Sequence, residues 1–253
     1  MPDPAPRRAH LITGGFPPGA PAGHDHDYAR LRLLTLLAER EVPASVGNDF
    51  SDIEKWLAVS RLLITYVAGP YPNPAQSAAI QSWMEAGGQW LGLHGTSGGK
   101  AERVDGIRQR RTVKTEHHAV LGGLFLTHPP LCRFRVDVVA HPLTQGLGTS
   151  FEIEDEPYFV ELQHPGDTQI LLTAEYGAQG DWPIVDTLYG RDTSLRADGK
   201  SRVLGYTRAV GAGAVTYFAF GHCTNPPVYR GPWENPAFTT LLRNAIALGV
   251  APA

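Results

Sequence analysis

Cysteine is scarce in this 253-residue chain, which has only Cys132 and Cys223. Two cysteines cannot build a disulfide framework, and the sequence contains no CxxC pair, so a disulfide-stapled scaffold is excluded. A reducing cytoplasm is the location that this cysteine usage favours.

Long apolar runs and an excess of one charge are also missing. No apolar run approaches the roughly 18 residues of a membrane-spanning helix, and the N-terminal stretch MPDPAPRRAHLIT lacks the apolar segment of a signal peptide. The formal net charge is only -3. Nucleic acids and anionic membranes call for clustered Lys and Arg, so we expect neither as a partner. The densest basic stretch, from Arg108 to Lys114, fits a solvated loop or, alternatively, an anion-handling loop.

Glycine and proline are abundant, with 28 and 21 residues, and they cluster between periodic segments. Long connecting loops of this kind often carry function. A hydrophobic content of 42% and a charged content of 19% fit a globular protein with one substantial core.

The first hundred residues alternate between strand and helix patterns. Strands are predicted over 9–13, 42–48, 61–67 and 89–93, and helices over 27–40, 51–60 and 74–88. This order predicts a parallel sheet with helices on both faces, and reactive groups beyond the carboxyl ends of the strands. Three local expectations follow: Asp25 or Asp27 caps the first helix, Ser51 and Glu54 form a capping box, and one apolar stripe faces inward. That stripe consists of Leu31, Leu34, Leu37 and Ala38.

The second half is less regular. A short helix is expected over 117–125, strands over 132–140, 168–176, 202–210 and 213–220, and a C-terminal helix over 235–250. Gly211 and Gly213 predict a hairpin turn. The C-terminal helix has an inward face made of Phe238, Leu241, Leu242, Ala245 and Ile246. We therefore expect a disordered tail over residues 1–9 and one α/β domain over 10–250, with an inserted antiparallel section.

His94 lies in the stretch QWLGLHGTSGG, at the end of a predicted strand and between Gly92 and Gly95. Many α/β enzymes hold a nucleophile on such a tight strand-to-helix elbow, written G-x-Ser-x-G or G-x-Cys-x-G. We interpret His94 as a general base or a metal ligand; the alternative is a histidine that only holds its loop. Backbone N–H groups of Gly95, Thr96 and Ser97 are candidates for contacting a substrate oxygen.

The chain has ten histidines, and several others also sit at strand ends or in glycine-rich loops. His222 follows the apolar run YFAF and is a second candidate for proton transfer. His24 and His26 form an H-x-H pair whose side chains point the same way in an extended segment. Together with His94 they are the predicted metal ligands, with zinc favoured by imidazole donors. No cofactor other than this possible zinc is indicated.

The segment EIEDEPYF gathers carboxylates within another strand-like run. Asp155 or Glu156 is a candidate acid, base or partner of a histidine, whereas a solvated acidic edge is the alternative. His128, in FLTHPP, is a candidate substrate contact or a turn residue. Cys223 reads as a small core residue rather than a nucleophile. The sequence has no phosphate loop, no dinucleotide fingerprint, no HExxH and no GxSxG.

An ordered series of motifs resembles the trehalose-utilisation (ThuA-like) family over residues 10 to 248. The motifs are LITGGF, HD, GLHGTS, LGGLFLTHP, HPLTQGL, DEPY, GAGAVTYFAFGH and NPAFTTLLRNAI. The resemblance implies a flavodoxin-like three-layer α/β sandwich with a mostly parallel central sheet, as in class I glutamine amidotransferases. In that pattern the elbow carries a cysteine and the late histidine is followed two places on by a glutamate; here these positions hold His94 and Thr224. Glutaminase chemistry is therefore not expected.

The family also implies a carbohydrate ligand, with 3-keto sugars as intermediates of disaccharide use. Aromatic platforms would suit such a ligand, and Tyr158, Trp182, Tyr189, Tyr229 and Trp233 are the candidates. We expect a cytoplasmic enzyme acting on a small sugar, or alternatively a non-catalytic sugar-binding or regulatory module. Whether copies of the chain associate into a homo-oligomer is left open.

Overall fold

The computed structural model describes residues 7–15, 23–103, 110–175 and 192–251. Its centre is one sheet of nine strands. In spatial order these are β2 (Ala44–Gly47), β1 (Ala9–Gly15), β3 (Leu62–Ala68), β4 (Gln89–Leu93), β13 (Gly213–Phe218), β12 (Ser201–Val210), β11 (Gln169–Glu175), β8 (Cys132–Val138) and β9 (Ser150–Asp155).

The first five strands in this order run parallel, and the last four are added in antiparallel pairs. The buried strands of the parallel part read as continuous apolar runs, as expected for a sheet covered on both faces. Because four successive antiparallel pairings lead from β13 to β9, these two strands run in the same direction. The carboxyl ends of β1, β4, β13 and β9 therefore face the same edge of the sheet.

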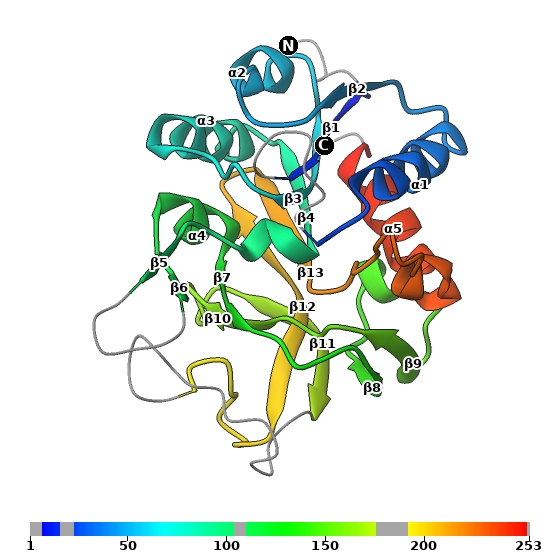
Figure 1. Cartoon of the computed structure of the whole chain (residues 1–253). Helices are drawn as coiled ribbons and strands as arrows, with labels where there is room; N and C mark the ends of the chain where they lie inside the picture. Colours follow the sequence, from blue (N-terminus) through cyan, green and yellow to red (C-terminus); the bar gives the residue numbers. More distant parts are fainter. Residues whose placement is uncertain (1–6, 16–22, 104–109, 176–191, 252–253) are drawn as a thin grey trace.

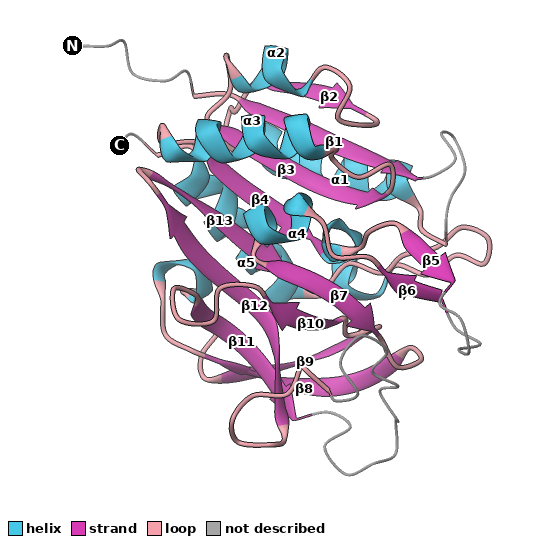
Figure 2. Cartoon of the chain, turned by 90° about the vertical axis from the view of Figure 1, so that its left-hand side faces the viewer, coloured by secondary structure: helices cyan, strands magenta, loops and turns pink. Residues whose placement is uncertain are grey.

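Helices cover both faces of the parallel half (Figures 1 and 2). One face carries α1 (His26–Ala38) and the C-terminal helix α5 (Pro236–Gly249), which contact each other. The other carries α2 (Ile53–Leu57), α3 (Pro74–Glu85) and α4 (Glu116–Leu121). This arrangement is the expected three-layer α/β sandwich. No helix in the described parts of the chain combines the length and the apolar character needed to cross a bilayer.

Two small sheets extend this frame. They pair β10 (Phe159–Leu162) with β7 (Gly123–Thr127), and β5 (Ala101–Arg103) with β6 (Arg110–Thr112). Arg108 lies outside the described residues, so the basic stretch is described only in part; within it, Lys114 Nζ lies 2.5 Å from Glu161 Oε1.

Several local predictions are confirmed. Asp25 caps α1, because its side chain accepts a hydrogen bond from the N–H of Tyr28. The hairpin turn between β12 and β13 lies at Gly211, whose φ of 59° suits glycine. The predicted inner face of α5 is buried in full.

Other local predictions are wrong, for identifiable reasons. Leu31 is 61% exposed and Ala38 is also exposed, because α1 turns a different stripe inward. Apolar residues occur all round this helix, so two stripes fit its periodicity, and packing against β1 and α5 selects one of them. The buried residues of α1 are His26, Ala29, Leu33, Leu36 and Leu37.

The remaining corrections concern element ends. The capping box of Ser51 and Glu54 does not form; Asp52 is the N-cap of α2, and the N–H of Ser51 bonds to Asp49 instead. The helix expected over 117–125 ends at Leu121, because Gly122 adopts a left-handed conformation and a strand follows. Ala9 is already buried in β1, so the expected tail does not reach it, and residues 1–6 lie outside the described part.

Candidate active site

The elbow expected at His94 is present. His94 follows β4 directly and begins a short 3₁₀ helix over His94–Ser97. Its φ of 43° lies in the left-handed region, which costs a non-glycine residue on the order of 1–3 kcal/mol. A Cβ at Gly95 would lie 2.3 Å from the carbonyl oxygen of Val67, so only glycine lets the chain pass β3. The hydroxyl of Tyr217 donates to the carbonyl oxygen of His94 at 2.8 Å. The sheet thus fixes the backbone that aims this imidazole.

Three imidazoles meet beyond the carboxyl edge of the sheet. His24, His94 and His222 each have a nitrogen within 4.8 Å of the corresponding nitrogens of the other two. The ring centroid of His24 lies 5.1 Å from that of His94 and 5.3 Å from that of His222. The ring centroid of His26 lies 5.8 Å from that of His24, but His26 does not belong to this group of three. The structure therefore joins His24 and His94 with His222, and places His26 beside the cluster.

Backbone pairing brings the loops of His24 and His222 together. The N–H of Asp25 donates to the carbonyl oxygen of Cys223 at 2.7 Å, and the Cys223 thiol lies 3.5 Å from the carbonyl oxygen of Asp25. Arg230 adds an ion pair, with its Nη1 2.6 Å from Asp25 Oδ2. Because each partner is the next residue in the chain, His24 and His222 lie side by side.

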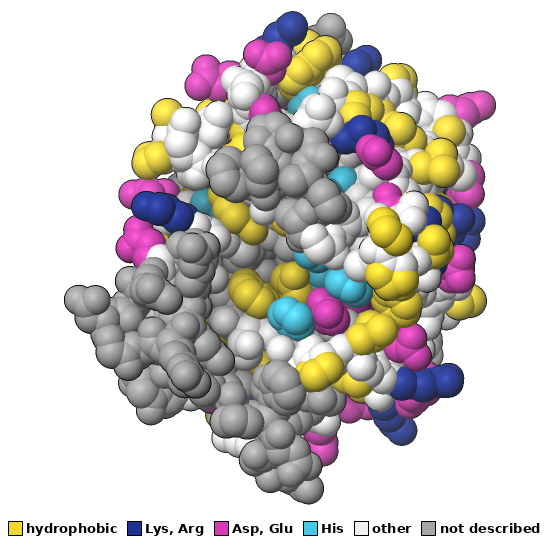
Figure 3. Space-filling view, viewed as in Figure 1, with side chains coloured by type: hydrophobic (Ala, Val, Ile, Leu, Met, Phe, Trp, Pro, Cys, Tyr) yellow, Lys and Arg dark blue, Asp and Glu magenta, His cyan; other side chains and the backbone are white. Residues whose placement is uncertain are grey.

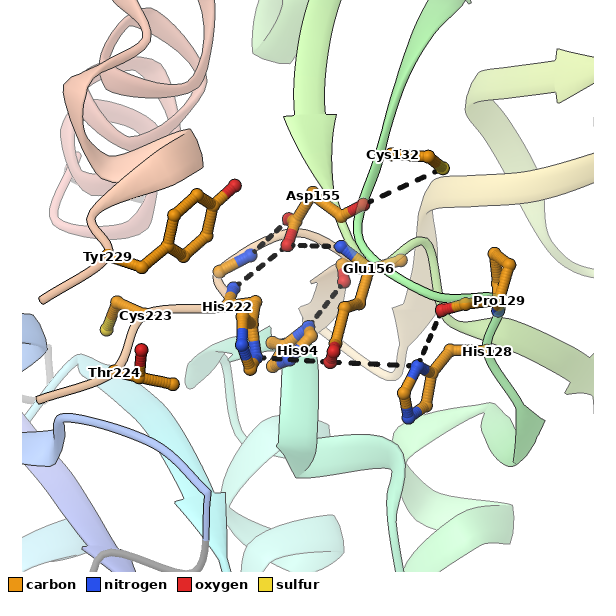
Figure 4. A network of polar contacts seen from close by, with 12 residues as sticks. His94, His128, Pro129, Cys132, Asp155, Glu156, His222, Cys223, Thr224 and Tyr229 are labelled. Carbon is orange, nitrogen blue, oxygen red and sulfur yellow. Dashed lines mark hydrogen bonds and ion pairs between the residues drawn. The ribbon is translucent and has the colours of Figure 1, made fainter. Parts of the chain in front are cut away.

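Glu156 supplies the carboxylate of the cluster (Figure 4). Its Oε2 lies 3.1 Å from Nδ1 of His222 and 3.6 Å from Nδ1 of His128. His128 also donates from Nδ1 to the carbonyl oxygen of Pro129 at 2.8 Å. Position 224, where the amidotransferase pattern has a glutamate, holds Thr224, yet His222 still has a carboxylate partner from a different part of the chain.

Asp155 faces the backbone rather than the imidazole rings (Figure 4). Its Oδ1 accepts from the N–H groups of Glu156 (2.8 Å) and His222 (3.1 Å), and its Oδ2 accepts from the N–H of Gly221 (2.8 Å). Complete burial raises the pKa of this carboxyl well above its usual range, and the three N–H donors act in the opposite direction by favouring the carboxylate. Asp155 therefore positions the loop that carries His222.

The protonation state of the imidazoles is set by their surroundings. Burial is the largest cause that lowers the pKa of His94 well below its usual range, and the neighbouring His24 adds to it. Burial also lowers the pKa of His222, against the opposing effect of Glu156. Both rings are accordingly neutral near pH 7, which leaves each with one nitrogen lone pair available for a proton or a metal.

The predicted substrate contacts divide into two groups. Thr96 and Ser97 turn their side chains into the core, where Thr96 donates to the carbonyl oxygen of Thr65 at 2.8 Å and Ser97 bonds to Tyr217 at 2.7 Å. The predicted contacts of Gly95, Thr96 and Ser97 are their backbone N–H groups, and these stay a prediction. Tyr158 and His128 do lie at the site. The Tyr158 ring centroid lies 3.8 Å from that of His94, with the two rings tilted, and the Tyr158 ring stacks on that of His128 at 5.3 Å. Burial raises the pKa of the Tyr158 phenol well above its usual range, so it stays a hydrogen-bond donor.

One site residue escaped the sequence analysis. Tyr66 lies near the end of β3, with its ring 5.9 Å from His24 and 6.3 Å from His94. Its hydroxyl donates to the carbonyl oxygen of Gly221 at 2.7 Å, next to the indole of Trp233, which donates to the same oxygen at 2.8 Å. A phenol at the carboxyl end of an otherwise apolar parallel strand was the available signal.

Of the other aromatic candidates, Tyr229 lies 5.8 Å from the ring of His222, whereas Trp233 is buried in the core. Trp182 and Tyr189 lie outside the described residues. On the surface, histidine side chains and an acidic side chain gather in a hollow bordered by apolar side chains (Figure 3).

The fold belongs to a class shared with glutamine amidotransferases. A Thermoplasma acidophilum protein, described as one of the subunits of GMP synthase, is 12% identical, with a TM-score of 0.52, and the alignment covers 96% of this chain and 94% of that one. The similarity supports the flavodoxin-like, class I glutamine amidotransferase-like sandwich expected from the sequence.

Within this class, the chain belongs to the ThuA family, described as trehalose utilisation, whose model matches residues 22–248. A ThuA-like protein from Bacteroides uniformis is 20% identical, with a TM-score of 0.64 and coverage of 97% of this chain and 93% of that one. A ThuA-like protein from Parabacteroides merdae is 16% identical, with a TM-score of 0.62 and coverage of 97% and 90%. No curated protein matches the chain.

Proposed function

We propose that this protein is an enzyme of trehalose or related disaccharide use that acts on a 3-keto sugar by proton transfer. One observation carries the proposal: the imidazoles of His94 and His222 lie with their ring centroids 5.9 Å apart, and Glu156 lies behind His222. A pair of titratable groups with a carboxylate partner is the arrangement of general acid–base catalysis. The family description, trehalose utilisation, supports a substrate derived from a disaccharide.

The chemistry needs only a base and an acid. A carbonyl at C3 acidifies the C–H bond at C2, and His94 removes that proton. The electron pair of the C–H bond first moves into an enolate. The enolate either takes a proton back from the solvent at C2 or expels the glycosidic oxygen from C1, which leaves a C1=C2 double bond. His222 acts as the acid in the fraction of molecules in which it is protonated, a form that the neighbouring Glu156 carboxylate favours, and gives its proton to the departing oxygen. The products are an unsaturated keto sugar and a free sugar, and no oxidant or reductant is consumed.

The same residues support the absence of glutaminase chemistry. The elbow carries His94 in place of a thiol, and the nearby Cys223 is fully buried. Burial raises the pKa of the Cys223 thiol to about 11, which disfavours the thiolate that attacks an amide. We therefore expect no release of ammonia from glutamine.

Proton exchange tests the proposal directly. The protein is incubated with 3-keto-trehalose and with 3-keto-glucosides in deuterated water, and NMR follows both deuterium uptake beside the carbonyl and the release of free sugar. Wild type should show both. His94→Asn should show neither, and it should fold, because asparagine tolerates a left-handed backbone better than most residues. His164→Gln is the matched control, since His164 only caps the carbonyl oxygen of Ala119.

Two outcomes would contradict this assignment. If wild type neither exchanges nor cleaves any keto sugar but is thermally stabilised by one, the protein is a non-catalytic binding module. If His94→Asn retains wild-type exchange, then His94 is not the base.

A further inference from the structure

We propose that His24, His94 and His222 form a binding site for a divalent transition metal, with zinc as the best fit, and that a fourth coordination position stays open. The open position as a place for a keto-sugar oxygen rests on the proposed function; metal binding itself does not. The three ligands come from three separate segments: the loop before α1, the elbow after β4 and the loop after β13.

The spacing of the three rings suits one ion. Their ligand nitrogens all lie within 4.8 Å of one another. Four-coordinate zinc with Zn–N distances of about 2.0–2.1 Å requires its ligand nitrogens to be roughly 3.3 Å apart. Small side-chain rotations are enough to close the difference, since the loops of His24 and His222 are already joined through Asp25 and Cys223.

One ligand nitrogen is in a position that calls for a partner. Nε2 of His94 is buried and has no hydrogen-bond partner among the described residues. Buried polar atoms in native proteins are almost always satisfied, so an orphaned imidazole nitrogen needs an explanation. An ion held between the rings provides it.

A hydrogen bond behind the ring of His94 fixes the tautomer that a metal ligand requires. Nδ1 of His94 lies 2.8 Å from the carbonyl oxygen of Ala219, which can only accept, so the proton sits on Nδ1 and Nε2 keeps its lone pair. Nδ1 of His222 lies 3.1 Å from Oε2 of Glu156 as an ion-pair contact, but it makes no hydrogen bond among the described residues. Ligands of zinc commonly donate their second ring N–H to a carbonyl or a carboxylate. The carbonyl arrangement occurs here at His94, and at His222 a carboxylate lies beside the second ring nitrogen.

The donor set also selects the type of ion. Mg²⁺ and Ca²⁺ prefer oxygen ligands, whereas imidazoles suit zinc and its neighbours among the transition metals. Three histidines with an open fourth position are a known ligand set of catalytic zinc. At that position an ion would polarise the carbonyl oxygen of a keto sugar. Because the ion would occupy the lone pairs with which His94 and His222 transfer protons in the proposed function, metal loading should slow keto-sugar turnover.

The H-x-H pair provides a matched control. His26 is only two residues from His24, and its ring lies 5.5 Å from that of Tyr66. It belongs to α1 and lies outside the group of three. His24 and His26 variants therefore differ in metal binding if the structure assigns the ligands correctly, and behave alike if the pair merely attracts ions.

The test uses the metal alone. Protein stripped with a chelator is titrated with Zn²⁺ by calorimetry, and with Co²⁺ while the visible d–d bands of a four-coordinate ion are recorded. Wild type should bind a stoichiometric amount of each and should not bind Mg²⁺. His24→Ala and His222→Ala should lose binding, His26→Ala should keep wild-type affinity, and Glu156→Gln should bind about 10- to 100-fold more weakly. Circular dichroism confirms that each variant folds.

Failure would be unambiguous. Absence of stoichiometric Zn²⁺ binding by wild type overturns the site, as does loss of binding in His26→Ala with retention in His24→Ala. Keto-sugar turnover at the same rate with and without bound Zn²⁺ keeps the proposed function and overturns the assignment of His94 and His222 as zinc ligands. Tight, His222-dependent Zn²⁺ binding without turnover of any keto sugar does the reverse.

Discussion

The N–H of Asp25 donates to the carbonyl oxygen of Cys223 at 2.7 Å, across a separation of 198 residues. This contact joins the first loop of the sheet to the last. It explains how His24 and His222 come to share one space with His94. Main-chain hydrogen bonding between loops assembles the site, and it determines where the histidine side chains lie.

Glu156→Gln should lower the turnover of keto sugar by about 100-fold with little change in KM, because His222 loses the charge that stabilises its protonated form. Thermal stability should change little. Steady-state kinetics and a melting curve measure both quantities. Glu154→Gln is the control, since Glu154 is an exposed carboxylate two residues away on β9. Equal kinetics for the two variants would remove Glu156 from the mechanism.

Asp155→Ala should destabilise the protein by roughly 2–5 kcal/mol, because three N–H groups lose their common acceptor while remaining buried. Urea denaturation measures the free energy of unfolding. Glu152→Ala, at an exposed position of the same strand, should change it by less than about 0.5 kcal/mol. A wild-type stability for Asp155→Ala would show that the loop of Gly221 and His222 is held by other contacts.

Gly95→Ala should cost about 1–3 kcal/mol of stability, because the added methyl group meets the carbonyl oxygen of Val67 at 2.3 Å and β3 cannot move away easily. Activity should fall as well, since the elbow that aims His94 shifts. Gly166→Ala provides the comparison: Gly166 is exposed, and an added Cβ there meets no atom within 4 Å. Equal melting temperatures for the two variants would contradict the close approach.

His10 should make stability depend on pH. It is buried, bonds to Ser45 at 2.8 Å and stacks on Trp56. Burial lowers its pKa from 6.5 to about 4 in the folded protein. The unfolded chain therefore binds the extra proton first, so the stabilising contribution is complete above pH 6.5 and is lost as the pH falls towards 4.

Between pH 7.5 and pH 5, wild type should lose about 2 kcal/mol more stability than His10→Gln, which has no proton to gain. Denaturant titrations at the two pH values measure the difference. An identical loss in both proteins would show that other buried histidines account for all of the pH dependence.

Much of the fold follows from local patterns. The alternation of apolar strands and capped helices predicts the parallel half, and the glycines around His94 predict its elbow. The orientation of α1 could not be read in this way, because leucines on several sides leave two inward faces open, and Leu31 proves to be exposed.

The sequence predicts which residues belong to the site better than it predicts which of them lie in contact. His94, His222, His24 and Glu156 all stand at strand ends or in the loops that follow, where reactive groups of parallel sheets collect. The replacement of His26 by His222 in the cluster depends on the contact of Asp25 with Cys223, which no local pattern contains. The pairing of Glu156 with His222 depends likewise on β9 returning, after four antiparallel steps, to the direction of β13.

The backbone at His94 is held by a tyrosine hydroxyl and by a glycine that fits beneath its neighbour, and neither contact involves the imidazole. The backbone conformation at position 94 is therefore set by other residues, independently of which side chain this position carries. A single substitution at position 94 can therefore change the reactive side chain while the backbone that positions it is retained. This offers a physical route by which one fold acquires unrelated reactions without passing through an unfolded ancestor.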